Sequence, residues 1–147
     1  MDTTAEILGP LGATPAPAEL PLFPDASCGF PSPAEAWSEP PLSLDDLVRV
    51  REPSTFLVRA RGDSMIEAGV YPDDVLVVDR SRQARSGDVI VARVGAEFLV
   101  KTLVIDGERV SLVPANRHHR PIVLGDGEEL EVWGVATWNL HRLGSSP

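Results

Sequence analysis

A serine and the only lysine of the chain have the residue types that nucleophilic catalysis needs. Ser64 lies in Arg61-Gly62-Asp63-Ser64, where a β run ends, Gly62 permits a tight turn, and the serine begins at most a turn and a half of helix. A hydroxyl at such a corner stands clear of the backbone, and the first amides of the turn point to where an oxyanion would form. The alternative, which the spacing alone favours, is that Asp63 or Ser64 only caps the turn.

Lys101 lies in an apolar run, residues 98–104, that alternates like a β-strand. The alternation places it on one face with Leu99 and Leu103. Burial of a lysine among apolar side chains lowers its pKa, because burial disfavours the ammonium form. A neutral lysine is a general base that can accept the proton of a hydroxyl group. The alternative is a lysine that extends from a strand end into water.

A third segment, around Cys28 and Gly29, has the character of a peptide substrate. Small residues precede the Cys28 carbonyl, and Pro31 and Pro33 keep the following chain extended rather than helical. A protease site needs such an open, extended peptide. Composition alone favours the alternative, an ordinary disordered tail.

Composition and charge restrict the class of protein. Acidic residues number 22 and basic residues 13, for a net charge of -9, so direct DNA binding is not expected. The single cysteine excludes an internal disulfide and a cysteine-rich zinc site, and we expect no cofactor or metal. His118 and His119 fall in a polar loop and are interpreted as structural. The start of the chain lacks a basic signal and no apolar run approaches the ~20 residues of a membrane span, which predicts a cytoplasmic protein without a membrane anchor.

The elements that must position these residues follow a proline-rich start. Nine of the 14 prolines lie in the first 41 residues, which predicts a flexible or extended arm over residues 1–41. Residues 42–147 are predicted to form a β-rich domain, which begins with one short helix that Ser43 caps. Short runs of Val, Ile and Leu predict strands at residues 55–61, 75–79, 88–94, 96–104, 109–113 and 130–137. Runs this short, without amphipathic helices between them, predict a mainly β fold packed as an antiparallel barrel or sandwich.

In this order along the chain, the three segments resemble the UmuD/LexA family of self-cleaving serine–lysine peptidases of the bacterial SOS response to DNA damage. The resemblance covers about residues 20–140 and rests on residues 28–34, 62–66, 97–101 and 134–137. The separation of 37 positions between Ser64 and Lys101 also matches the spacing of the family. The repressors of the family carry an N-terminal helix-turn-helix, and the proline-rich start of this chain is too short for one. The similarity is therefore to the UmuD-type accessory subunits.

The resemblance implies that Ser64 is the nucleophile, that Lys101 is its general base, and that Cys28–Gly29 is the bond the protein cuts in itself. It also implies a homodimer and stimulation of cleavage by a RecA–single-stranded DNA filament. The product, residues 29–147, would serve as accessory subunit of an error-prone, UmuC-type translesion polymerase. One alternative stays open, a non-catalytic β-fold regulatory module that binds a polymerase. A serine–lysine signal peptidase is not expected, because such enzymes require a membrane anchor and the sequence predicts none.

Overall fold

The chain forms two compact units, Met1–Pro10 with Ser54–Pro147, and Leu11–Pro53. The structure is a computed structural model that describes residues 2–10, 19–22, 39–125 and 128–144. The expected site residues Cys28 and Gly29 lie outside the described residues. Within the described ranges, no helix has the length and apolar character needed to cross a membrane.

The smaller unit contains a β hairpin followed by one turn of helix. Strand β2 (Glu19–Leu22) pairs antiparallel with β3 (Glu39–Ser43), and α1 (Leu44–Leu47) follows directly. The Ser43 hydroxyl accepts a hydrogen bond from the Asp46 amide at 3.3 Å, which confirms the predicted N-cap and short helix. The sequence did not predict the two strands because both contain proline. Proline is tolerated here because both strands of a two-stranded sheet are edge strands.

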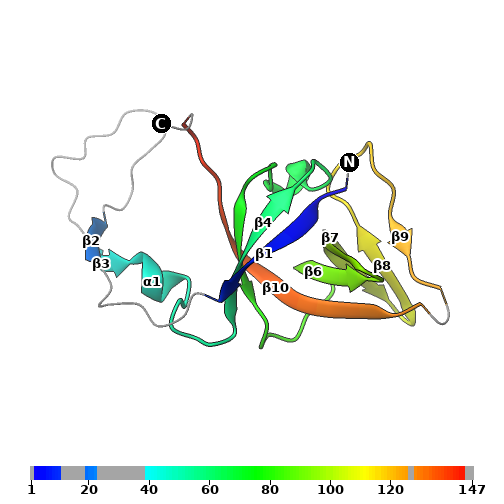
Figure 1. Cartoon of the computed structure of the whole chain (residues 1–147), viewed down its shortest axis with the longest axis horizontal. Helices are drawn as coiled ribbons and strands as arrows, with labels where there is room; N and C mark the ends of the chain where they lie inside the picture. The colour runs from blue at the N-terminus through cyan, green and yellow to red at the C-terminus, as the bar shows by residue number, and fades with distance from the viewer. Residues whose placement is uncertain (1, 11–18, 23–38, 126–127, 145–147) are drawn as a thin grey trace. The chain divides into compact units, whose positions relative to one another are not determined.

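The larger unit is an eight-stranded antiparallel sheet in the order β1-β4-β5-β10-β6-β7-β8-β9 (Figure 1). An additional pairing of β1 with β7 closes six of these strands into a barrel, which confirms the predicted mainly β fold. The strands are β1 (Thr4–Pro10), β4 (Thr55–Arg61), β5 (Val75–Asp79), β6 (Val89–Val94), β7 (Glu97–Asp106), β8 (Arg109–Val113), β9 (Ile122–Val123) and β10 (Leu130–Leu140). Three of them match the strands predicted at residues 55–61, 75–79 and 109–113 in full.

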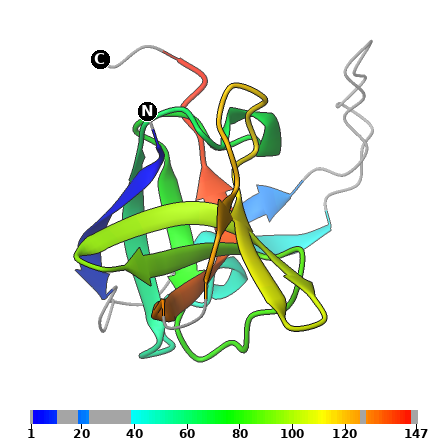
Figure 2. The same ribbon diagram turned by 90° about the vertical axis from the view of Figure 1, so that its right-hand side faces the viewer.

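Strand β1 differs from the predicted arm, because the first ten residues belong with the barrel. It pairs antiparallel with β4, from Thr4 opposite Arg61 to Pro10 opposite Phe56, with an irregularity between Ile7 and Gly9. Figure 2 shows β1, in blue, beside β4. The segment is too short and too polar to be recognised locally. Its strand conformation comes from backbone pairing with β4 and β7, which lie far along the chain.

The core of the barrel consists of two groups of buried apolar side chains. The first contains Val58, Ala60, Met65, Val70, Leu76, Val78, Val91, Val100 and Trp133, and the second contains Ile90, Ala92, Leu103, Leu112 and Val135. Strand β10 approaches β5 closely at Gly134, where a Cβ atom would lie 2.5 Å from Val78 Cγ1. On β7, Lys101 stands between Val100 of the first group and Leu103 of the second. The lysine side chain is fully buried.

Candidate active site

Ser64 lies at a corner that directly follows β4. Gly62 has a φ of 83°, in the left-handed region that glycine adopts without strain, and turns the chain as soon as β4 ends at Arg61. After Ser64, Met65 enters the core with no exposed surface, and one 3₁₀ turn, η2 (Ile66–Ala68), follows. The predicted strand, tight turn and short helix are confirmed, with the helix reduced to this turn. Ser64 itself has no exposed surface.

The loop between β8 and β9 holds this corner in place. Asn116, which is 5% exposed, donates a hydrogen bond from Nδ2 to the Asp63 carbonyl at 2.9 Å. The Ala115 carbonyl accepts one from the Glu67 amide at 2.7 Å. Hydrogen bonds from the backbone and then the guanidinium of Arg117 hold the pKa of Glu67 below its ordinary value. The backbone on both sides of Ser64 is thus fixed by a loop that the sequence did not single out.

Lys101 reaches Ser64 from the middle of β7, where it pairs with Ile90 of β6. Its side chain has no exposed surface, and Nζ lies 2.7 Å from Ser64 Oγ. The alternative of a lysine extending into water is therefore wrong, because the side chain is fully buried. The fold brings together two residues that the sequence separates by 37 positions.

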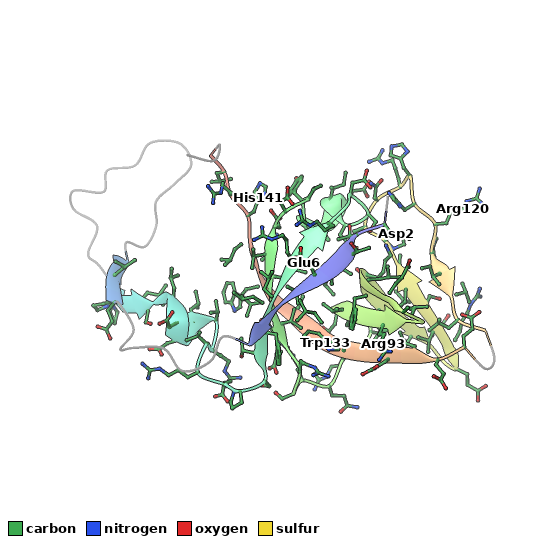
Figure 3. The ribbon with its side chains drawn as sticks, in the orientation of Figure 1. Asp2, Glu6, Arg93, Arg120, Trp133 and His141 are labelled. Carbon is green, nitrogen blue, oxygen red and sulfur yellow. The ribbon has the colours of Figure 1, made fainter. Side chains whose placement is uncertain are left out.

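The residues that precede β1 contact both of these side chains. Asp2 Oδ1 accepts a hydrogen bond from Lys101 Nζ at 3.0 Å. The Thr3 amide donates to Ser64 Oγ at 2.7 Å, and the Thr3 carbonyl accepts from the Val100 amide at 2.9 Å. Figure 3 shows Asp2 at the start of β1. The sequence offered no signal for these contacts, because it assigned both residues to the arm.

Comparison with known proteins identifies the family of the chain. Residues 21–137 match the Peptidase S24-like family. The chain belongs to it. Protein SamA of Salmonella typhimurium is 37% identical over 133 residues, which cover 90% of this chain and 92% of SamA. Protein MucA of Escherichia coli is 40% identical over 116 residues, 78% of each chain. LexA repressor 1 of Xanthomonas axonopodis pv. citri is 36% identical over 116 residues, 79% of this chain and 57% of the repressor.

The S24-like match confirms the resemblance predicted from the sequence, and it separates two parts of the site. Ser64 and Lys101 fall inside the matched residues 21–137, whereas Asp2 and Thr3 precede them. The hydroxyl and the amine therefore belong to the region that this chain shares with the family. The acidic residue and the backbone amide that contact them come from outside that region.

His119 is a further neighbour that the sequence analysis missed. Its Nε2 lies 2.9 Å from Asp63 Oδ1, and its Nδ1 lies 3.6 Å from Asp2 Oδ1. The hydrogen bond from Lys101 lowers the pKa of Asp2 against the opposing effect of burial, and the charges of Lys101 and His119 lower it further. The Asp2 carboxylate thus lies between two groups that favour its charged form. The β8–β9 loop brings His119 there, which its place in a polar stretch could not indicate.

The arrangement has the parts of a serine nucleophile with an amine base. An amine within 2.7 Å of a hydroxyl can take its proton, provided the amine is neutral at that moment. A buried hydroxyl and amine are also shielded from water, which strengthens the electrostatic interactions between them and a developing oxyanion. Asp2 and Thr3, by contrast, already occupy hydrogen-bonding positions of Lys101 and Ser64.

Proposed function

We propose that the protein is a self-cleaving serine peptidase in which Ser64 is the nucleophile, Lys101 is the general base, and the Cys28–Gly29 bond is the substrate. The observation that carries the proposal is the 2.7 Å contact between Lys101 Nζ and Ser64 Oγ, with neither side chain exposed. Membership of the Peptidase S24-like family supports the class of reaction. The assignment of the cleaved bond rests on the sequence.

In the acylation step, neutral Lys101 takes the proton of Ser64 while Oγ forms a bond to the Cys28 carbonyl carbon. The carbonyl oxygen becomes an oxyanion, which we assign to backbone N–H groups at the Asp63–Ser64 corner. The C–N bond then breaks, and the ammonium of Lys101 returns its proton to the Gly29 amine. An ester links residues 1–28 to Ser64, and residues 29–147 have a new N-terminus.

In the deacylation step, Lys101 is neutral again and takes a proton from a water molecule that attacks the ester carbonyl. Breakdown of the tetrahedral intermediate releases Ser64 Oγ, which recovers its proton from Lys101. The products are the Cys28 carboxylic acid and free enzyme. Atoms and charges balance without a metal or a redox partner, so the two side chains and one water are sufficient.

The segment that links the substrate to the nucleophile is long enough for this reaction. Gly29 to Asp63 is 35 residues, which span at most about 115 Å when fully extended. Cleavage can therefore occur within one chain or between two copies. Removal of residues 1–28 would also take away four negative charges and no positive ones.

We further propose that this cleavage serves the SOS response to DNA damage, in the cytoplasm, with the protein as a homodimer. The support is the UmuD-type resemblance and the identity to SamA, MucA and LexA repressor 1. By that resemblance, a RecA–single-stranded DNA filament stimulates cleavage and a UmuC-type translesion polymerase binds the product. A cleavage time course with and without filament tests the first partner, and co-purification of residues 29–147 with such a polymerase tests the second.

The dyad is tested by Ser64→Ala and Lys101→Ala in the full chain, incubated at about pH 10, where an ordinary lysine is neutral in a far larger fraction of molecules than at pH 7. Each substitution should abolish self-cleavage, whereas Ser111→Ala on β8 should cleave as the unchanged protein does. Circular dichroism establishes that all variants are folded. Normal processing of either site variant would refute the mechanism, and a complete absence of cleavage in the unchanged protein would favour the non-catalytic regulatory module.

The cleaved bond is tested by the intact mass of the large fragment. The mass should correspond to residues 29–147. A fragment that begins elsewhere would leave the dyad in place but refute Cys28–Gly29 as the substrate.

A further inference from the structure

Residues 2–10 complete the backbone pairing around the dyad. Along β7, residues 102–106 pair with β8, whereas Leu99 pairs with Thr4 and the Val100 amide bonds to the Thr3 carbonyl. On the other side, β1 pairs with β4 along its length. Without β1, the described parts of β4 and β7 would present unpaired N–H and C=O groups on both sides of Ser64. Such open strand edges accept an extended peptide by β-augmentation.

The contacts of Thr3 occupy the nucleophile. A serine hydroxyl has two acceptor lone pairs, and Ser64 Oγ accepts one hydrogen bond from the Thr3 amide and one from Lys101 Nζ. Attack requires a free lone pair and a carbonyl carbon about 3–3.5 Å from Oγ. The Thr3 nitrogen already lies 2.7 Å from it, so the backbone of a substrate cannot lie there as well.

The contact of Asp2 disables the base. A carboxylate within hydrogen-bond distance of a lysine stabilises the ammonium form, and an ammonium cannot accept a proton. Asp2 Oδ1 lies 3.0 Å from Lys101 Nζ, and His119 on the β8–β9 loop holds the same oxygen from 3.6 Å. His119 also contacts Asp63, through its Nε2 atom. Asp2 therefore pairs its carboxylate with the buried amine while residues 2–10 are docked.

We propose that residues 2–10 are an inhibitory strand that occupies the peptide-binding site of the protein, and that self-cleavage requires this strand to leave. The inference rests on the proposed self-cleavage and names its regulation. While docked, Thr3 excludes the Cys28 carbonyl from Ser64, and Asp2 holds Lys101 as the ammonium ion. Once released, the strand leaves the edges of β4 and β7 open to an extended cleavage segment and leaves Lys101 without its carboxylate.

Several features of the docked strand oppose docking or hold it only weakly. Thr3 Oγ1 is buried and has no hydrogen-bond partner among the described residues, which opposes docking. The Asp2 side chain is 48% exposed, so water can compete for its ion pair. Further along β1, the ion pair of Glu6 with Arg61 is also at the surface. Apart from its backbone pairing with β4 and β7, the strand is therefore held by side-chain contacts for which water can compete.

Asp2→Asn tests the hold on the base. The variant should cleave itself severalfold faster at neutral pH, and its rate should rise at lower pH than in the unchanged protein, because the carboxylate that pairs with Lys101 Nζ is gone. Glu108→Gln removes the same charge from an exposed turn between β7 and β8 and should leave the rate unchanged. Equal pH profiles for Asp2→Asn and the unchanged protein would overturn the role of Asp2.

A measurement that does not depend on cleavage uses the only lysine of the chain. In Ser64→Ala protein labelled with ¹³C-lysine, the Cε resonance reports the Lys101 ammonium without overlap from other lysines. Adding Asp2→Asn should move the loss of this proton to lower pH. An unchanged titration would overturn the inference. A moved titration together with no cleavage of the unchanged protein at any pH would refute the proposed function and leave the Asp2 contact standing.

Thr3→Val tests the strand in the opposite direction. Valine has the shape of threonine and removes the buried hydroxyl that lacks a partner, so the strand should dock more firmly. Self-cleavage should become about fivefold slower at neutral pH, by removal of roughly one unpaired polar group. A faster rate would show that docking of Thr3 does not limit the reaction.

A reversible disulfide tests displacement directly. Glu6 of β1 pairs with Arg59 of β4, and directly opposed residues of antiparallel strands have Cα separations that a disulfide can bridge. Oxidised Glu6→Cys/Arg59→Cys protein, with the bridge established by peptide mapping, should not cleave itself, and reduction should restore cleavage. The two single variants control for pairing with Cys28. If the oxidised protein cleaved itself as fast as the chemically reduced protein, the proposal would be overturned.

Discussion

Among the described residues of the larger unit, the charged side chains of Asp74 and Lys101 are buried, and they are held in different ways. Asp74 is 4% exposed and accepts hydrogen bonds from the Tyr71 amide and Asn139 Nδ2, both at 2.8 Å, with His141 Nδ1 at 2.6 Å. Lys101 is fully buried, and one of its two partners, Asp2, belongs to a strand that can leave. A buried charge whose partners are all fixed stabilises the fold. A buried charged group whose partner can leave can be freed to act as a general base.

The surroundings of Asp74 determine its charge. Burial by itself raises the pKa of Asp74, but the hydrogen bonds from Asn139, the Tyr71 amide and His141 outweigh it and hold the pKa below its ordinary value. The carboxylate is therefore the stable form at neutral pH. Figure 3 shows His141 on the segment that follows β10, so this cluster ties the C-terminal end of the barrel to the turn after η2.

The largest effect should come from Lys101→Met, which keeps the length and burial of the side chain and removes the amine. Self-cleavage should fall by at least ~10³-fold, because the base is lost. The free energy of unfolding should stay the same or rise, because an apolar residue replaces a buried charge. Rates from gels and urea unfolding curves measure the two effects. A clear loss of stability would mean that Lys101 also holds the fold together.

Asp74→Asn should have the reverse pattern. Its new NH₂ group faces the donors of Asn139 and Tyr71, so the free energy of unfolding should fall by about 1–3 kcal/mol, while the folded variant still cleaves. Asp106→Asn, at the exposed end of β7, is the matched control and should unfold as the unchanged protein does. Equal free energies of unfolding for Asp74→Asn and Asp106→Asn would show that Asp74 does not stabilise the fold. The contrast between Asp74 and Lys101 would then be lost.

The contribution of Asp74 to the free energy of unfolding should depend on pH in the acid range. The folded pKa of Asp74 lies below its ordinary value of 3.8, so its contribution to stability is present above that pH and is lost as the pH falls through the folded value. Unfolding free energies measured between neutral pH and pH 3 should decline more steeply for the unchanged protein than for Asp74→Asn. Parallel curves would contradict this contribution.

The smallest effect should come from His119→Gln. His119 contacts Asp2 only at 3.6 Å, so its loss should loosen the docked strand slightly and raise the cleavage rate by less than about threefold. The comparison variant is His118→Gln on the same loop. A large loss of cleavage in His119→Gln would instead assign His119 a direct role in the chemistry.

Much of the barrel could be predicted from the sequence because its strands carry their own signals. Residues 55–61, 75–79 and 109–113 are dense in β-forming side chains and end at turn residues, and the structure has strands at those positions. The corner at Gly62 could be predicted for the same reason, whereas the apolar alternation around Lys101 left open whether its side chain is buried or extends into water. Strand alternation and turn chemistry act over a few residues, so a local segment contains them.

The rest depended on partners that no local segment contains. Asp2 and Thr3 look like part of a polar arm, and they meet Lys101 and Ser64 only because β1 inserts beside β4 and β7. His119 reaches the site because its loop folds over the corner. The sequence alone determined that a serine would follow the end of one β-strand and that a lysine would lie within another, apolar strand. Only the tertiary structure decided that they touch and that the start of the chain covers them, because backbone pairing between distant strands leaves no periodic pattern in either segment.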